Sequence, residues 1–325
     1  MPENLFKIKK IELKAKKFGK LFISFDGCIM NNYRKLIDEM KTGRCVLIDG
    51  ATATELERRG VPQILNVWNG GGALSHPDVL KDIHKSYIRT GARVIISNTF
   101  ANCKYTLEDA AQSHNFERLN SRGVSIAVDA RMEEKKPDVL VAGGISYWSF
   151  INCHPALPSL KKNVSDQALI MKNAGADLIM LEMMVDIKRM MVTFHAAEKA
   201  NLPIWVGLSC KPNTDGEMCL LNGELLSQAL QYLKYENIDL VNIMHTDVTY
   251  IGKCLDVIEA EWNGLYGVYA HSGSMKGSYW TFNHVISPEL YYKYASKWLK
   301  RKVNLIGGCC GITTDHMQHL SKALF

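Results

Sequence analysis

The chain has 325 residues, of which 47% are hydrophobic and nine are proline, so its composition is that of a globular protein with a large core. Its formal net charge is +6, but residues 1–20 hold seven lysines and two glutamates, so the remainder is nearly neutral. This distribution argues against a nucleic-acid-binding surface. The sequence also lacks the roughly 18 consecutive apolar residues of a membrane span, and no apolar signal segment opens it.

The nine cysteines are too sparse and too few for a disulfide scaffold in a chain of this length, and their odd number gives no pairing framework. Such usage is typical of a reducing compartment, so we expect a cytoplasmic protein. Its expected partners are small molecules, with no nucleic acid and no membrane. Whether the chain forms a homo-oligomer stays open.

Residues 1–43 precede the repeating pattern of the chain and are predicted to form an N-terminal extension. The stretch "GKLFISFDGCIMNNYRKLIDEM" has a short apolar run followed by a helical pattern. We expect this extension to pack on one end of the main domain or on a partner subunit.

From residue 44 onward, eight short apolar runs alternate with longer segments of helical period. Each run is apolar on both faces, which favours a parallel strand covered on both sides. The predicted strands are 44–50, 92–100, 138–146, 177–184, 203–210, 238–245, 264–271 and 303–310.

The intervening helices have recognisable starts, with Ser75, Ser165 and Ser287 as the expected N-caps. The methionine-rich stripe within 185–200 is predicted to face the core rather than a ligand. Eight strands alternating with helices predict an α/β protein in which 44–325 forms a single (β/α)8 TIM barrel. A doubly wound sheet is the alternative, but no GxGxxG motif opens a βαβ unit.

Active sites of such barrels gather at the carboxyl ends of the strands. Eight separate segments deliver polar or thiol groups to that rim, which is hard to explain as core packing. The residues at these ends are Asp49, Asn98, Thr99, Ser146, Glu182, Cys210, His245, His271, Cys309 and Cys310.

Cys309 and Cys310 stand side by side among glycines in "NLIGGCCGIT". Adjacent cysteines are poor disulfide partners because the ring is strained, but two thiolates on one loop can bind a soft metal ion. A catalytic zinc ion needs a third protein ligand, with the fourth position kept for water or substrate. The rim offers Cys210, His245 and His271 for that role.

Several motifs in order give the chain a family resemblance. "IGGCCGITTDHMQHL" resembles the signature of the homocysteine S-methyltransferase family, and "VLIDGATATELERRG" is similar to the opening strand of that family. "WNGGGALSHPDVLKDIHKSYIRTGARVIISNTFA" and "AGADLIMLEMM" resemble its second unit and its acid-bearing strand. The likeness covers roughly 44–325.

The resemblance implies a Zn²⁺ ion held by three cysteines, two from the GGCC loop and one at the end of the sixth strand. This chain has "DLVNIMHT" in that strand, and an ungapped count from Asp239 places His245 at the third cysteine. The implied ligands are therefore His245, Cys309 and Cys310. Cys210 is the second candidate for the third ligand, and a metal-free site is the third possibility.

The resemblance also implies which residues bind the acceptor. Asp49 and Glu182 match positions that contact homocysteine in the family, Glu182 through the amino group, and are the expected catalytic pair. Gly50 and Thr99 match the substrate side as well. For Asp49, an N-cap of the following helix is the structural alternative.

Aromatic residues are expected to bind the methyl donor. Trp68, Tyr147, Trp148 and Phe150 could form a cation–π cage for a methylated onium group, or could simply pack loops on the rim. The predicted reaction is zinc-dependent methyl transfer from betaine or a sulfonium, such as S-methylmethionine or dimethylsulfoniopropionate, to homocysteine, giving methionine. A lyase using His245, His271 and a carboxylate, or a non-catalytic relative, remains the alternative.

Overall fold

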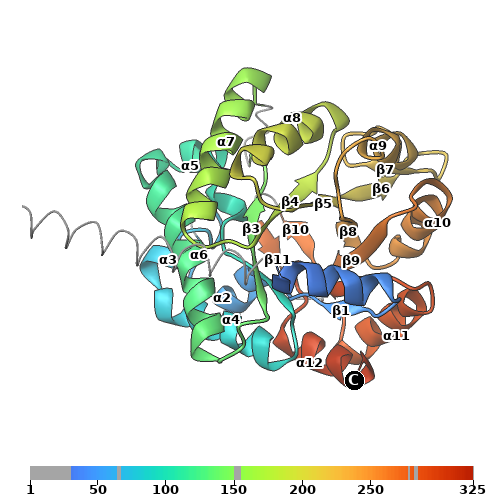
Figure 1. Ribbon diagram of the computed structural model, residues 1–325, viewed down its shortest axis with the longest axis horizontal. Coiled ribbons are helices and arrows are strands. Elements are labelled where there is room, and N and C mark those ends of the chain that lie inside the picture. Colours follow the sequence, from blue (N-terminus) through green and yellow to red (C-terminus); the bar gives the residue numbers. More distant parts are fainter. Residues whose placement is uncertain (1–30, 64–66, 150–154, 277–278, 282–284, 325) are drawn as a thin grey trace, which may run out of the picture.

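The fold is a barrel of parallel strands surrounded by helices (Figure 1). In the computed structural model, residues 31–63, 67–149, 155–276, 279–281 and 285–324 are described. The eight strands are hydrogen-bonded in the order β1-β12-β9-β8-β5-β4-β3-β2. Their bounds are β1 Val46–Leu47, β2 Val94–Ile96, β3 Leu140–Ile145, β4 Leu178–Met184, β5 Ile204–Leu208, β8 Leu240–Asp247, β9 Leu265–His271 and β12 Leu305–Gly308.

The sheet closes on itself. β1 pairs with β12 through Val46 and Leu47, and a parallel bridge from Ile48 to Val94 joins β1 to β2 on its other side. Most strand residues are buried, because one face of the sheet fills the barrel and the other packs against helices. The predicted (β/α)8 barrel is therefore confirmed, and each predicted strand contains or overlaps an observed one.

Helices cover the outside of the barrel. They are α2 Thr52–Arg58, α3 Gly72–Ser75, α4 Pro77–Arg89, α5 Lys104–Asp109, α6 Phe116–Glu133, α7 Leu157–Asn173, α8 Ile187–Ala197, α9 Leu226–Leu233, α10 Ile251–Glu261, α11 Pro288–Leu299 and α12 Thr314–Leu324. None of the helices in the described ranges is long and apolar enough to cross a membrane.

Only one of the three predicted serine caps is confirmed. The Ser287 side chain accepts a hydrogen bond from Leu290 N at the start of α11. Ser75 instead ends α3, and His76 is the N-cap of α4 without a side-chain bond. Ser165 lies in the middle of α7 and donates to the carbonyl of Ala196. These two predictions were wrong because each hydroxyl donates to a backbone carbonyl, Ser75 to Gly71 and Ser165 to Ala196, instead of accepting from a helix N–H.

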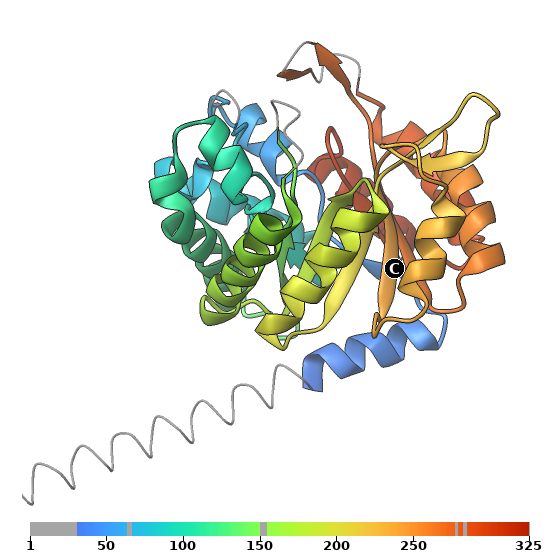
Figure 2. The same ribbon diagram turned by 90° about the horizontal axis from the view of Figure 1, so that it is seen from above.

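A helix over 31–41 closes the end of the barrel opposite the carboxyl ends of the strands (Figure 2). The Tyr33 hydroxyl donates to Asp239 Oδ2 at 2.6 Å and accepts from Trp205 Nε1 at 2.9 Å. Asn304 Nδ2 donates to the carbonyl of Met40. The described part of the extension therefore packs on the amino ends of strands, which leaves the other rim open to ligands.

Two hairpins follow the carboxyl ends of strands at the open rim. β6 Cys210–Pro212 and β7 Met218–Leu220 come after β5, and β10 Ser274–Lys276 and β11 Tyr279–Thr281 come after β9. Figure 2 shows the β10–β11 hairpin projecting at the end opposite the helix over 31–41. Neither hairpin was predicted from the sequence.

A buried ion pair joins α6 to the start of β4, and its loss should destabilise the fold. Arg131 Nη1 lies 2.5 Å from Asp177 Oδ2, with side chains 4% and 0% exposed, and the same carboxylate accepts from Val141 N. Arg131→Met leaves Asp177 as an uncompensated buried charge, so the free energy of unfolding in urea should fall by about 3–5 kcal/mol.

The exposed pair of Arg122 and Asp129 on the same helix is the matched control. Arg122→Met should change the free energy of unfolding by at most about 1 kcal/mol. If both variants lost the same free energy of unfolding, burial of the Arg131–Asp177 pair would not be the cause of the destabilisation.

Candidate metal centre and substrate cavity

A cavity of about 360 Å³ opens at the carboxyl ends of the strands. This is within the usual size range of small-molecule sites. Eight of the ten predicted rim residues line it: Asp49, Asn98, Glu182, Cys210, His245, His271, Cys309 and Cys310. The other two lie outside the cavity, because Thr99 donates to the carbonyl of Gly144 and Ser146 to that of Phe100.

The backbone of the cysteine loop is held on both sides. Cys309 N donates to the carbonyl of Ala270, and Ser272 N donates to the carbonyl of Cys310. Gly311 has φ +81°, and a Cβ there would overlap the carbonyl oxygen of Ser272. Only glycine fits this position, so the loop can present two adjacent thiols at the end of β12.

His245 reaches the cavity from a bulge in β8. The pairing of β8 with β9 shifts register between Met244 and Asp247, and His245 has φ +43°. β4 has a similar irregularity before Met184, where Met183 has φ +52° beside Glu182. A bulge re-aims side chains at the end of a strand, and left-handed backbone is uncommon for residues other than glycine.

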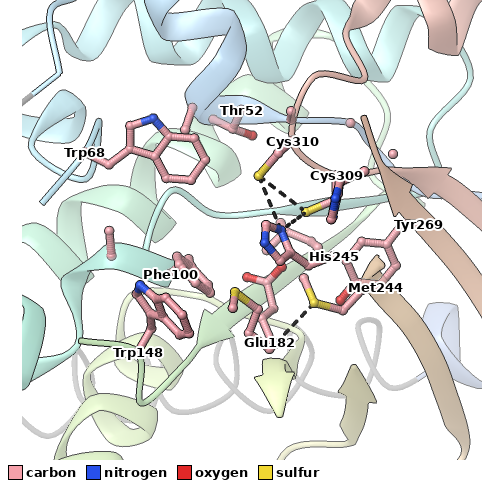
Figure 3. A pocket seen from close by; sticks show the side chains of 18 of the residues that line it. Thr52, Trp68, Phe100, Trp148, Glu182, Met244, His245, Tyr269, Cys309 and Cys310 are labelled. Atoms are coloured by element: carbon pink, nitrogen blue, oxygen red, sulfur yellow. Dashed lines mark hydrogen bonds between the residues drawn. The ribbon is translucent and has the colours of Figure 1, made fainter. Parts of the chain in front are cut away.

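Three ligand-type atoms meet at one side of the cavity (Figure 3). His245 Nδ1 lies 3.6 Å from Cys309 Sγ and 3.5 Å from Cys310 Sγ, and the two sulfurs are 3.8 Å apart. A tetrahedral zinc ion with Zn–S near 2.3 Å and Zn–N near 2.0–2.1 Å would place such atoms about 3.8 Å and about 3.5–3.6 Å apart. The three residues therefore fit a tetrahedral ion and leave its fourth position open to the cavity.

The hydrogen bond between the two thiols shifts their pKa values in opposite directions. The contact with Cys310 is the main cause that lowers the pKa of Cys309 well below its usual value, and His245 adds to it. The same contact raises the pKa of Cys310, together with burial. Metal ligation needs the thiolate form of both cysteines, so binding of a cation would release their thiol protons.

The other two candidate ligands lie beside this group rather than in it. His271 packs against His245, with ring centroids 4.6 Å apart, and its pKa is lowered to about 4 by burial and then by His245. Cys210 lines the cavity, but its pKa is raised chiefly by a hydrogen bond with Cys254. Among the described residues, the group of possible metal ligands contains neither His271 nor Cys210.

Two buried carboxyl groups face the cavity. Asp49 and Glu182 are 2% and 7% exposed, and burial raises the pKa of each well above its usual value. The nearby Cys309 charge raises both further. Asp49 Oδ2 accepts from Ile96 N at 2.8 Å, and Ala51 is the N-cap of α2, so Asp49 does not cap that helix. A cationic group placed between the two carboxyl groups would offset the cost of their burial.

The predicted aromatic residues divide into two groups. Trp68 and Trp148 line the cavity together with Gly50. Tyr147 lies in the core, where its hydroxyl accepts from Val185 N at 2.9 Å. Phe150 falls outside the described residues.

Sequence reasoning missed Phe100, Tyr250 and Tyr269, which also line the cavity. Phe100 is the last residue of the predicted second strand, and this position was a signal that could have been used. Figure 3 shows Trp68, Phe100 and Trp148 on one side of the cavity, and His245, Cys309 and Cys310 on the other. An apolar, aromatic wall therefore faces the group of possible metal ligands.

The chain is similar to known proteins over most of its length. The sequence model of the homocysteine S-methyltransferase family matches residues 46–324. Homocysteine S-methyltransferase 1 of Arabidopsis thaliana is 26% identical, over 87% of this chain and 94% of its own length. Betaine–homocysteine S-methyltransferase 1 of Danio rerio is 23% identical, over 90% of this chain and 76% of its own length.

The fold is similar to that of a solved structure. The metallated form of the homocysteine methyltransferase MmuM from Escherichia coli superposes with a TM-score of 0.71 at 20% identity. The match covers 86% of this chain and 96% of that one.

Proposed function

This chain belongs to the homocysteine S-methyltransferase family, and from that premise we propose that it moves a methyl group from an onium donor to homocysteine, giving methionine. A zinc ion bound by His245, Cys309 and Cys310 is part of the proposal. One observation carries it: the tetrahedral spacing of three ligand atoms across a shared cavity from an aromatic wall.

The ligand set favours zinc over other common metals. Two thiolates and one imidazole at tetrahedral spacing are typical of zinc, whereas magnesium and calcium select oxygen ligands. When bound, zinc supplies the positive charge that keeps a coordinated thiol deprotonated near neutral pH. A set of two cysteines and one histidine carries one less negative charge than three cysteines.

The acceptor is held by the carboxyl groups of the chain. Glu182 would accept hydrogen bonds from the homocysteine ammonium group, with Asp49 adding charge from the end of β1. Charge-assisted bonds of this kind are short and strong, and here they lie in a buried site. They anchor the amino end of homocysteine, and the covalent length of the molecule then carries its sulfur toward Cys309 and Cys310 in the same cavity.

The aromatic wall holds the donor. Trp68 and Trp148 can place their faces against a methylated onium group, and their bulk excludes water. The acceptor sulfur forms a bond to the methyl carbon while the bond from that carbon to the donor nitrogen or sulfur breaks. The electron pair leaves with a neutral amine or thioether, and the acceptor thiol proton passes to solvent. Because the ligand set carries less negative charge, the bound thiolate would be a weaker nucleophile, and we therefore expect a donor with a good neutral leaving group.

Metal analysis combined with a panel of donors tests this function. We expect about one zinc per chain after extensive dialysis, and methionine formed from homocysteine with at least one of betaine, S-methylmethionine and dimethylsulfoniopropionate. The variant that lacks both Cys309 and Cys310 should lose both properties. A chain that holds no zinc and transfers no methyl group from any onium donor would contradict the proposal.

Substitutions of His245 test the third ligand. His245→Cys should retain zinc, because it restores a three-thiolate set, whereas His245→Ala should lose zinc or hold it loosely. Position 245 has a left-handed backbone, which histidine adopts more readily than cysteine does. The cysteine variant should therefore be somewhat less stable than the wild type. Zinc content after dialysis against a weak chelator is the measurement, and full retention by the alanine variant would exclude His245 as a ligand.

The proposal includes a cytoplasmic location. The seven described cysteines form no disulfide, which fits a reducing compartment. The partners would be a small thiol acceptor and a small methyl donor.

A further inference from the structure

The β6–β7 hairpin brings a lysine to the mouth of the cavity. Lys211 lines the cavity next to Cys210, and its side chain is exposed. Of the described residues that line the cavity, Lys211 alone carries an ammonium or guanidinium group. No ion pair within the described ranges includes it, whereas the exposed Lys162 on α7 and Lys234 after α9 are both paired.

The position of Lys211 is fixed by its backbone. Lys211 pairs with Cys219 across the hairpin, and Cys210 N donates to Thr246 Oγ1 at 2.9 Å. Leu221 N donates to the carbonyl of Ser209 at 3.1 Å, which closes the base of the hairpin on β5. These backbone bonds hold the Cα of Lys211 at the rim. Binding of a ligand would therefore need to order only the lysine side chain.

The strands on either side of Lys211 carry residues with other proposed roles, which leaves the substrate carboxylate without a cationic partner. β5 lies between β4, which carries Glu182, and β8, which carries His245. Under the proposed function, the ammonium of the acceptor is placed at Glu182 and Asp49 and the onium of the donor at the aromatic wall. Both molecules also carry a carboxylate, and neither the carboxyl groups nor the aromatic rings offer it a positive charge.

We propose that Lys211 binds the carboxylate of a zwitterionic substrate and thereby selects amino-acid-like or betaine-like molecules. This inference rests on the proposed function for the identity of the ligands. The carboxylate could come from the acceptor or from the donor, since both have the same chemistry at this end. Lys211 is then a specificity-determining residue, and its loss should leave the chemical step itself intact.

The test measures binding to the zinc-loaded protein by tryptophan fluorescence, with each ligand titrated beside an analogue that lacks the carboxylate. The acceptor arm compares homocysteine with 3-aminopropane-1-thiol. The donor arm compares dimethylsulfoniopropionate with ethyldimethylsulfonium and betaine with tetramethylammonium. Lys211→Met should weaken binding of the carboxylate ligand in one arm by about tenfold and leave its analogue unchanged.

Two further variants separate a charge effect from general disturbance. Lys211→Arg should restore most of the lost affinity, because it keeps the positive charge. Lys188→Met removes an exposed lysine of α8 that does not line the cavity, and it should behave as the wild type.

Steady-state kinetics is the second measurement that tests the role of Lys211. The KM of the same substrate should rise in Lys211→Met while kcat changes little. Unchanged affinity for the carboxylate ligands in both arms would overturn the inference, as would an equal loss for the analogues. If the wild type transfers no methyl group but the charge-dependent binding is observed, the proposed function fails and the carboxylate site stands.

Discussion

Changing Cys309 to serine is expected to remove most of the zinc and nearly all methyl transfer. A serine hydroxyl keeps the shape of the side chain, but it is a much poorer ligand than a thiolate. Cys309 is also the thiol whose pKa is lowered by Cys310 and His245, so it is the one poised to ligate as a thiolate. The loss should exceed the roughly 10- to 100-fold reduction that follows removal of an outer-shell partner of a metal site.

Zinc content after dialysis and the rate of methionine formation are the two measurements for this variant. Cys45→Ser is the matched control, because Cys45 is a partly buried free cysteine that immediately precedes β1, away from the cavity. It should keep both zinc and activity. Full zinc and full activity in Cys309→Ser would show that the cysteine pair is not the metal site.

Replacing Glu182 by glutamine should give the largest effect on acceptor binding. Glutamine keeps the shape but removes the charge that would pair with the homocysteine ammonium, in a position that is 7% exposed. Losing one partner of a buried charge pair costs about 2–5 kcal/mol, so the KM for homocysteine should rise about 30-fold or more. Zinc content should stay as in the wild type, because Glu182 does not belong to the group of possible ligands.

The specificity of this effect can be checked with a thiol that lacks the amino group. 4-Mercaptobutanoate has the chain length and carboxylate of homocysteine, and the wild type should prefer homocysteine over it strongly. Glu182→Gln should lose most of that preference. An unchanged KM for homocysteine would show that Glu182 is not the amino anchor.

The barrel itself was predictable because its physical signal is strong and repeated. Runs such as 138–146 and 177–184 are apolar at successive positions, which requires cover on both faces of the strand. Helix starts were less predictable, since a serine hydroxyl can donate to a nearby carbonyl instead of accepting from the first amide groups of a helix. Ser165 had the sequence context of a cap, yet its hydroxyl bonds to Ala196 of the neighbouring helix.

The site was predictable at the level of strand ends but not of side-chain direction. Asp49, Glu182 and the cysteine pair reach the cavity as expected. Tyr147 and Thr99 do not, because the end of a strand gives the height of a residue in the barrel and not the way its side chain points. The bulges that carry Met183 and His245 depend on long-range pairing with neighbouring strands, which no local pattern records.

X-ray absorption at the zinc edge tests the central claim most directly, because it counts the atoms around the metal. For the protein without substrate, we predict two sulfur ligands near 2.3 Å and a histidine nitrogen near 2.0–2.1 Å, with the fourth position held by a light atom. Addition of homocysteine should raise the sulfur count by one. Three sulfur ligands before any thiol is added would place Cys210 in the shell in place of His245, and a sample without zinc would contradict the metal centre altogether.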